Sequence, residues 1–437
     1  MSPFRGPAFH RLPVMSGVRP WLATIPPLAV AAIGAVGMVS LWRVGPPASA
    51  VALRLPAERV GDPSLEDAPP PLELARLVPG PGAPSELPGS WPGFRGPNLD
   101  GVSPESVPLA DRWPASGPPV LWSIEVGEGY AGPAIHRGRV YLVDYDREAQ
   151  ADAVRCLSLA DGREIWRFTY PVVVKRNHGM SRTIPAVTDR HLVALGPMGH
   201  VSCLDATSGE FRWGIDLVRE FGTTIPPWYA GQCPLVDGDR VVLAPAGGGP
   251  DQPLLMAVDL ESGEVVWSTP NTLAWKMTHA SVAAAETAGR RSYVYCGHRG
   301  VAGVAADDGS LLWSTGEWRI SIATVPTPVP VPGDRLFLSG GYQAGSMMLR
   351  VEQVDGSWHA VPQFRLGPEV FGATQQTPIW FDSHLFGVRP DGELTCLAPD
   401  GTPSWSSGPS HRFGLGPFLV ADGKLLVLDD DGRLTMA

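Results

Sequence analysis

The residues best suited to binding lie in short polar stretches that follow several recurring tryptophans. They combine cations, amides and aromatic rings, a mixture that suits an anionic or carbohydrate-like ligand, or a peptide. The alternative interpretation is that these stretches are polar only because surface loops are hydrated. The candidate binding residues are Tyr130, His178, Arg182, Trp228, Tyr229, Lys276, His279, Gln375, Gln376, His411 and Arg412.

Sequence patterns of catalysis are absent from the chain. It has no Gly-x-Ser-x-Gly elbow, no phosphate-binding loop and no His-Glu-x-x-His pair. The acidic run Asp429–Asp431 offers only three short ligands for calcium, which is too few to predict a metal site. We therefore predict no catalytic residue and no bound metal.

The elements that must position the candidate residues are repeats marked by tryptophan. Five of these tryptophans come four residues after a glycine in an Asp/Ser-Gly turn. Their spacing of roughly forty to fifty residues is typical of propeller blades, in which we expect the rings to pack between neighbouring sheets. The predicted blade-docking residues are Trp122, Trp166, Trp213, Trp267, Trp313, Trp358 and Trp405.

The residues between the tryptophans form short apolar runs bounded by Gly, Pro and Asp, such as 240–244 and 335–339. Such runs predict β-strands and disfavour the helical solenoids of similar period. Each blade is then four strands, and the Asp-Gly pairs at Asp237 and Asp422 suit its first hairpin. The links from one blade to the next converge on one face, so we expect the candidate binding residues around the mouth of a central channel.

Counting the inner strands predicts how the ring closes. Seven triplets begin near residues 131, 184, 231, 280, 325, 377 and 416. No tryptophan follows the last triplet before Ala437, and no triplet precedes Trp122. Because an incomplete blade would expose an unpaired edge, we predict a seven-bladed ring in which Trp122 lies on the outer strand of the last blade. The predicted fold class is all-β.

The front of the chain differs in composition. Residues 1–20 carry three arginines and no acidic residue, and residues 21–43 contain an uncharged apolar run that is long enough to cross a bilayer. We predict a cytoplasmic N-terminus, a transmembrane signal anchor at 21–43, a proline-rich disordered linker at 44–90 and a propeller at 91–437 on the periplasmic, extracytoplasmic side. Cleavage near Ala48–Ala50 is the alternative to a retained anchor.

The net charge argues against one class of partner, and the cysteines argue against a disulfide framework. A net charge of -10 gives no electrostatic basis for binding nucleic acid. Three of the five cysteines, Cys156, Cys203 and Cys396, fall at equivalent places in different repeats. We therefore predict buried free thiols and no disulfide framework.

The repeats resemble a known family. The pattern Asp-x-x-Ser-Gly-x-x-x-Trp at 205–213 and 259–267 resembles the tryptophan-docking repeat of PQQ-like, or quinoprotein-like, β-propellers. The segment Trp-Pro-Gly-Phe-Arg-Gly-Pro-Asn-Leu-Asp-Gly at 91–101 resembles the stretch that precedes the ring in many bacterial PQQ-like repeat proteins. The resemblance covers about 91–437 and implies a quinoprotein-like propeller fold.

Two branches of that family imply different functions. Quinoprotein alcohol and glucose dehydrogenases have eight blades, and many carry an adjacent cysteine pair and a calcium site. This sequence has no adjacent cysteine pair, and no calcium triad can be mapped onto it. The other branch consists of scaffolds, such as the propeller of the outer-membrane β-barrel assembly machinery.

We therefore predict a non-enzymatic, membrane-tethered scaffold that binds envelope proteins or a small ligand at the channel mouth, without a cofactor. One alternative is a PQQ-dependent alcohol or sugar dehydrogenase, in which the channel-mouth residues would hold the quinone. Another is a carbohydrate-binding or sensory ectodomain.

Overall fold

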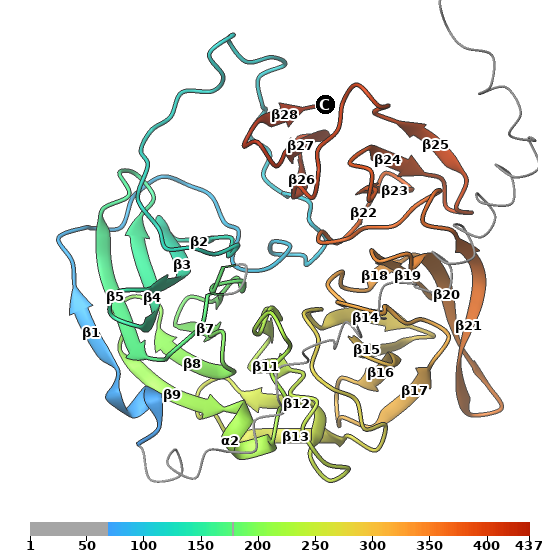
Figure 1. The fold of residues 1–437 in the computed structure, drawn as a ribbon, viewed down its shortest axis with the longest axis horizontal. Coiled ribbons are helices and arrows are strands. Elements are labelled where there is room, and N and C mark those ends of the chain that lie inside the picture. Colours follow the sequence, from blue (N-terminus) through green and yellow to red (C-terminus); the bar gives the residue numbers. More distant parts are fainter. Residues whose placement is uncertain (1–68, 177–178) are drawn as a thin grey trace, which may run out of the picture. The chain divides into compact units, whose positions relative to one another are not determined.

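Short turns make consecutive strands antiparallel neighbours, and this arrangement builds nearly the whole structure. The structure is a computed structural model that describes residues 69–176 and 179–437. Within this part of the chain the strands form seven antiparallel sheets around a central axis (Figure 1). We number them sheet 1 to sheet 7 in chain order. In each, the strand that comes first in the chain lies nearest the axis, apart from the added strand β1.

The strand bounds follow the chain. Sheet 1 has the order β1-β5-β4-β3-β2, and sheets 2 to 6 have four strands each, while sheet 7 has three. Sheets 1 and 2 contain β1 (Arg76–Pro79), β2 (Ala134–His136), β3 (Arg139–Asp146), β4 (Ala151–Ser158), β5 (Glu164–Pro171), β6 (Ala186–Val187), β7 (His191–Leu195), β8 (His200–Asp205) and β9 (Phe211–Asp216). Sheets 3 and 4 contain β10 (Leu235–Asp237), β11 (Arg240–Leu243), β12 (Pro253–Asp259), β13 (Val265–Pro270), β14 (Ala283–Thr287), β15 (Arg290–Gly297), β16 (Gly300–Ala305) and β17 (Leu311–Thr315). Sheets 5 to 7 contain β18 (Val329–Val331), β19 (Arg335–Gly340), β20 (Gly345–Val354), β21 (Ser357–Leu366), β22 (Ile379–Phe381), β23 (His384–Val388), β24 (Leu394–Leu397), β25 (Pro403–Ser406), β26 (Phe418–Ala421), β27 (Lys424–Leu428) and β28 (Leu434–Met436).

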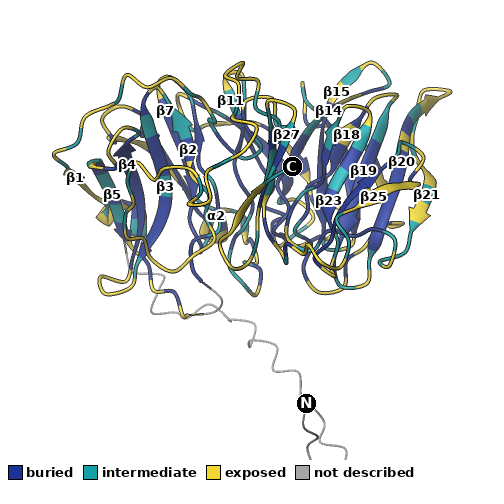
Figure 2. Cartoon of the chain, turned by 90° about the horizontal axis from the view of Figure 1, so that it is seen from above, coloured by how far each residue is buried: buried dark blue, intermediate teal, exposed yellow. Residues whose placement is uncertain are grey.

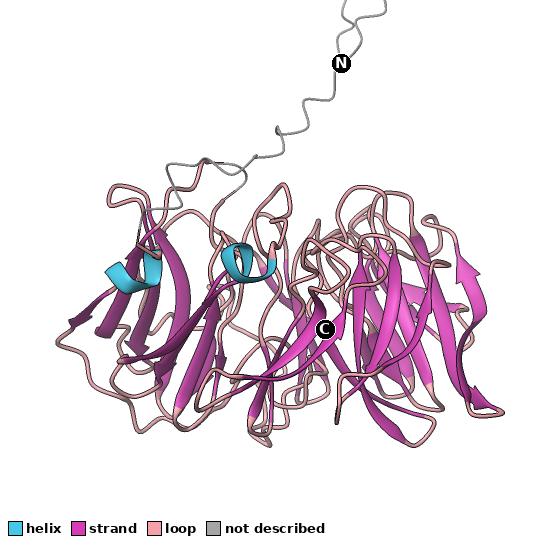
Figure 3. Cartoon of the chain, turned by 90° about the horizontal axis from the view of Figure 1, so that it is seen from below, coloured by secondary structure: helices cyan, strands magenta, loops and turns pink. Residues whose placement is uncertain are grey.

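Two short helical elements accompany the sheets, the 3-10 turn η2 (Pro71–Leu74) and the helix α2 (Leu217–Phe221), and the other regular elements of the described residues are strands (Figure 3). Burial follows the position of a strand within its sheet. Every residue of β4 and β16, the third strands of their blades, is buried. The outer strands β9 and β13 alternate between buried and exposed residues, as expected where one face meets water. Figure 2 shows the same contrast between buried strands and exposed loops.

Tryptophan docking explains the repeated glycine turn. The Trp166 ring of sheet 1 lies against Gly209 in the last turn of sheet 2, where a Cβ atom would come within 2.6 Å of the ring. Gly209 also has a φ of 79°, so only glycine suits the position. The Trp166 indole donates to the carbonyl of Thr207 at 3.0 Å. Trp213 lies against Gly263, and Trp267 against Gly309, in the same way.

Sheet 5 uses a different ring from the predicted one. Its hairpin of β20 and β21 has ten residues on each side, which places Trp358 near the tip, opposite Gln353. Phe364 instead lies over Gly401, where a Cβ atom would approach its ring to 2.7 Å. Phe364 also pairs with Met348 just before a register shift, the place that Trp213 takes opposite Cys203. Trp358 is therefore not the docking residue of this sheet.

We expect Phe364→Ala to lower the free energy of unfolding by about 2–3 kcal/mol, because a half-buried interblade ring is lost. Trp358→Ala is the matched control and should cost roughly 1 kcal/mol or less, since this ring lies near a hairpin tip. Urea unfolding followed by tryptophan fluorescence measures the first variant, and circular dichroism measures both. A larger loss for Trp358→Ala would restore the predicted assignment.

Two other predicted docking residues, Trp313 and Trp405, differ in how far they are exposed. Trp313 is buried, with 4% of its surface exposed, whereas Trp405 is 44% exposed. Trp405 pairs with Cys396 on β24, and its ring centroid lies 6.1 Å from that of Phe386 in its own sheet.

The prediction that Trp122 lies on the outer strand of the last blade is wrong. Residues around Trp122 belong to no strand, and sheet 7 ends at β28 without a fourth strand in the described part of the chain. Contacts with sheet 1 hold this stretch instead. The Trp122 indole donates to the Leu159 carbonyl at 2.9 Å and its ring lies against Gly162, while the Gly127 amide donates to Asp144 at 2.7 Å.

Residues 91–103, which we call the inner clamp, join the first and last sheets across the centre of the ring (Figure 1). Trp91 and Ile135 of β2 exchange two backbone hydrogen bonds of 2.8 Å. At the other end, Ser103 donates to Val420 of β26 at 2.7 Å, and Val420 donates to Gly101 at 3.0 Å. The clamp therefore connects the inner strands of sheets 1 and 7, which the outer strands do not connect.

Arg95 holds the inner clamp in its looped shape. Its guanidinium donates to the carbonyls of Asp100 at 2.8 Å, Leu99 at 2.9 Å and Pro378 at 3.0 Å. Burial lowers the pKa of Arg95 to about 10, and nearby Asp100 partly offsets this effect. The side chain thus satisfies carbonyls that would otherwise lack donors at the centre of the ring.

Part of the predicted disordered linker is ordered. Residues 71–74 form η2, and β1 at 76–79 adds a fifth strand to the outer edge of sheet 1 by pairing with β5. The prediction of an unstructured linker across 44–90 is therefore wrong for these residues. The run Arg-Leu-Val-Pro was too short to suggest a strand, and it is stabilised by covering the edge of β5.

Candidate functional site

The links between sheets and the turns between second and third strands lie on the same face, which we call the link face. Five of the predicted binding residues come together there: Tyr130, Arg182, Trp228, Tyr229 and His279, named the mouth cluster. The Arg182 guanidinium lies 5.2 Å from the centroid of the Tyr130 ring, a cation–π geometry. The centroids of Trp228 and His279 are 6.3 Å apart.

Backbone pairing positions the mouth cluster. Tyr130 donates its amide to Ser181 at 2.7 Å, and Met180 donates to Glu128 at 2.9 Å, so the two links run side by side. This pairing explains why the Tyr130 ring meets Arg182. Tyr130 remains 68% exposed and is therefore available to a partner.

The protonation states of the cluster place its charge on one residue. Burial, with a further contribution from Arg182, lowers the pKa of His279 to about 4. Burial also lowers the pKa of Arg182, but an arginine remains protonated under ordinary conditions. At neutral pH the cluster therefore presents a guanidinium, a neutral imidazole and three aromatic rings.

The other predicted binding residues lie on different links. Gln376 is buried, and its amide donates to the Val388 carbonyl at 2.8 Å, a structural role. Lys276 and Gln375 are exposed, as are His411 and Arg412 on the link before β26. His178 lies outside the described residues.

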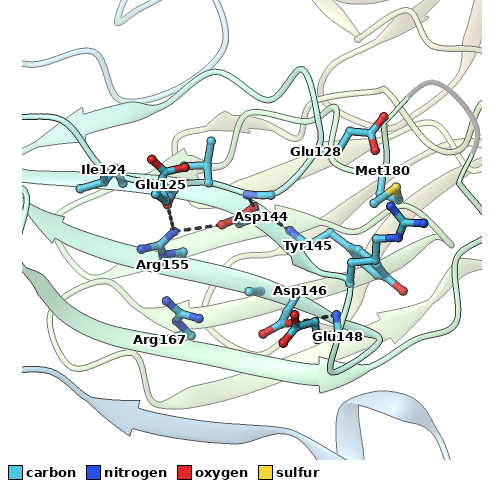
Figure 4. Close-up of a pocket in the computed structure, with 14 residues that line it drawn as sticks. Ile124, Glu125, Glu128, Asp144, Tyr145, Asp146, Glu148, Arg155, Arg167 and Met180 are labelled. Atoms are coloured by element: carbon cyan, nitrogen blue, oxygen red, sulfur yellow. Dashed lines mark hydrogen bonds and ion pairs between the residues drawn. The ribbon is translucent and has the colours of Figure 1, made fainter.

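A groove of about 630 Å³ adjoins the mouth cluster (Figure 4). It opens between residues 124–128 and the strands β3 and β4, and Glu128 and Met180 connect it to the paired links. Its lining residues are Ile124, Glu125, Val126, Gly127, Glu128, Asp144, Tyr145, Asp146, Arg147, Glu148, Ala153, Arg155, Arg167 and Met180. The groove was not predicted, because residues near Trp122 were expected to lie in the last blade.

A buried arginine fastens the wall of this groove. Arg155 donates to Asp144 at 3.0 Å, to the Glu125 carbonyl at 3.1 Å and to Glu164 at 2.8 Å. Arg167 also pairs with Glu164, at 2.9 Å. These ion pairs fix the wall and neutralise its deepest acids, so the charge available to a ligand lies at the rim.

A second groove, of about 490 Å³, lies by the first hairpins of sheets 3 and 4. Its charges satisfy one another. Arg291 pairs with Asp237 at 2.8 Å, the Tyr293 hydroxyl donates to Asp237 at 2.8 Å, and Arg290 pairs with Asp307 at 2.9 Å. We therefore regard it as a structural contact between sheets.

The acidic run Asp429–Asp431, for which no metal site was predicted, forms a turn. Asp429 accepts from the amides of Asp431 at 3.0 Å and Arg433 at 2.8 Å, and Asp430 accepts from Leu415 at 2.9 Å. Across residues 69–176 and 179–437, no three His, Cys, Asp or Glu side chains are grouped so that they could hold a metal ion. All five cysteines are buried and free, which confirms the prediction of unpaired thiols.

The predicted membrane anchor at 21–43 lies outside the described residues and stays a prediction. Within residues 69–176 and 179–437, no helix has the length and apolar character that a membrane crossing requires.

Comparisons with known proteins match this geometry. A family model described as "Outer membrane protein assembly factor BamB" matches residues 150–363. The solved structure of BamB from Moraxella catarrhalis has 15% identity and a TM-score of 0.50, over 72% of this chain and 85% of that one. None of the curated proteins matches this chain in sequence.

Two quinohemoprotein alcohol dehydrogenases are also similar. ADHIIG from Pseudomonas putida HK5 has 14% identity and a TM-score of 0.41, covering 78% of this chain and 75% of that one. The enzyme from Comamonas testosteroni has 14% identity and a TM-score of 0.41, covering 68% of this chain and 62% of that one.

The antiparallel sheets and their glycine-docked tryptophans define a β-propeller, and the likeness to BamB is one of fold. Residues 150–363 match a family of PQQ-like repeat propellers, the likeness that the tryptophan repeats predicted.

Proposed function

We propose that this chain is a non-enzymatic, seven-bladed scaffold of the cell envelope, tethered to the membrane by residues 21–43, that binds a partner through its link face. The observation that carries the proposal is the mouth cluster. The exposed Tyr130 ring and the half-buried Trp228 and Tyr229 rings lie near a guanidinium and are held by paired links, and this is the composition of a protein-binding hot spot. The family match to an outer membrane protein assembly factor supports the same class of partner.

A quinone fits the mouth cluster poorly. Pyrroloquinoline quinone carries three carboxylates, whereas the mouth cluster contains one cation, Arg182, whose guanidinium already faces the Tyr130 ring. The centre of the ring is crossed by the inner clamp, whose backbone bonds to β2 and β26. We therefore derive no reaction step through this cofactor.

Photo-crosslinking in cells tests the proposed binding face. A photoreactive phenylalanine at Trp228 should form an adduct with an outer-membrane assembly protein, and Arg182→Ala should reduce its yield about tenfold. Val265, exposed on the outer strand β13, is the control position and should give no such adduct. Equal adducts at both positions, or none at Trp228, would contradict the proposal.

Two further measurements address the alternatives and the location. Adding the quinone with calcium to the purified chain should give neither a bound chromophore nor dye reduction with alcohols or sugars, and turnover would establish the dehydrogenase instead. Glycan-array binding without a protein partner would favour the carbohydrate-binding alternative. Alkaline phosphatase fused after Ala437 should be active, because the propeller is proposed to lie outside the cytoplasm.

A further inference from the structure

The outer edge of β28 offers unpaired backbone groups. Leu425 and Ala437 exchange both backbone hydrogen bonds, at 2.8 and 2.9 Å. Because such pairs alternate along an antiparallel ladder, Thr435 faces β27 with its N–H and C=O, whereas Leu434 and Met436 direct theirs away from the sheet. In the described part of the chain no strand pairs with this edge, although sheets 2 to 6 each have a fourth strand there.

The chain that approaches sheet 1 beside sheet 7 is also unpaired. It runs between the two sheets in Figure 1, and Val120, Leu121 and Val126 are 82%, 77% and 54% exposed. Side-chain contacts with sheet 1 hold it in place, through Trp122 and Asp144. Sheets 7 and 1 are neighbours in the ring, so a strand added to β28 would lie on the side of this apolar stretch. It would need no docking ring, because Trp122 already covers Gly162.

The groove formed with residues 124–128 carries acidic side chains. Glu125, Asp146 and Glu148 line the groove and are in no ion pair among the described residues, whereas Arg155 and Arg167 are neutralised by acidic partners. Arg147 is the one remaining cation of the lining. The side chains of an added strand should therefore include basic residues.

We propose that β28 receives, as the fourth strand of sheet 7, an extended segment of a partner protein in which apolar residues alternate with Lys or Arg. Backbone hydrogen bonds to Leu434 and Met436 supply affinity, the apolar residues contact the exposed 120–126 stretch, and the basic residues meet the acids of the groove. The inference rests on the proposed scaffold function and names the form of the partner segment.

The test measures binding of a fluorescent nine-residue peptide of alternating valine and lysine to the full chain. We expect saturable binding that weakens as salt is raised. Met436→Pro removes an N–H that faces outward and should weaken binding at least tenfold, while Met436→Leu, the matched control, should not. Leu434→Pro is the second proline variant if Met436→Pro fails to fold, as judged by circular dichroism. Glu148→Lys should weaken binding several-fold.

A peptide methylated on alternate backbone nitrogens separates strand pairing from charge attraction, because its side chains are unchanged. If this peptide binds as tightly as the unmodified one, or if Met436→Pro binds normally, the inference is overturned. A disulfide that forms between Leu121→Cys and Leu434→Cys would show that the chain's own segment fills the site. A dimer that both proline variants disrupt would assign the site to a second copy.

Failure of this inference and of the scaffold proposal can be told apart. If the peptide does not bind but the adduct at Trp228 persists and depends on Arg182, only the strand pairing is wrong. If the adduct is lost as well, the proposed function fails with it.

Discussion

Arg95→Met is expected to lower the free energy of unfolding by about 3 kcal/mol, although it keeps most of the apolar stem. The reason is that three carbonyls, of Leu99, Asp100 and Pro378, lose their donor near the centre of the ring, and each unsatisfied buried carbonyl costs about 1 kcal/mol or more. Urea unfolding followed by circular dichroism gives the difference.

The matched control for Arg95→Met is Arg112→Met, which changes an exposed arginine later in the same stretch. It should alter stability by less than about 0.5 kcal/mol. An equal effect of the two substitutions would mean that the inner clamp does not stabilise the ring. Proteolysis offers a second readout, because cleavage between residues 91 and 111 should accelerate only in Arg95→Met.

Asp152→Asn is expected to stabilise the protein at pH 8 by roughly 2–4 kcal/mol while changing little at pH 4. Asp152 is 1% exposed, and the Tyr170 hydroxyl donates a hydrogen bond of 2.6 Å to its carboxyl group. Burial raises the pKa of Asp152 to about 7, with nearby Asp144 adding to the effect.

The sign follows from the raised pKa. The folded protein holds this proton more tightly than the unfolded chain, so the stability it contributes is complete below about pH 4 and is lost as the pH rises to about 7. Urea unfolding between pH 4 and pH 8 should show this loss in the native protein and not in Asp152→Asn. The exposed Asp251→Asn is the control. An unchanged pH slope in Asp152→Asn would contradict the assignment.

The repeated elements were predictable because each repeat needs the same two features, a glycine turn and an aromatic ring that packs on a neighbouring sheet. A glycine with positive φ four residues before a tryptophan marks a turn that only glycine fits and a ring that must be covered, as at Gly209 and Trp213. Phe364 does not fit that pattern, because its hairpin is longer. Trp358 has the expected spacing, so it was predicted as the docking residue in place of Phe364. A signal was present, since Phe364 comes 37 residues before Gly401, close to the 40 residues between Trp122 and the glycine that it covers, Gly162.

The part of the candidate site that lies on neighbouring links, the mouth cluster, was predictable. Repeat order placed Tyr130, Arg182 and Tyr229 on successive links, and their proximity follows from the ring. The groove was not predictable, because its wall depends on whether residues 124–128 join sheet 7 or bind sheet 1. That choice is made by the Asp144 and Arg155 side chains, which no period in the sequence connects to Glu125.

The inner clamp has a consequence for the order in which the molecule assembles. Ser103 of the clamp binds Val420 in the last sheet, and Arg95 donates to Pro378, which lies 283 positions later in the chain. Since the clamp is synthesised before any sheet it contacts, it must wait until the final sheet leaves the ribosome. Individual blades can form as they emerge, but the ring is closed only after translation, when the inner clamp binds the last sheet. Contacts between residues so far apart in the chain form slowly.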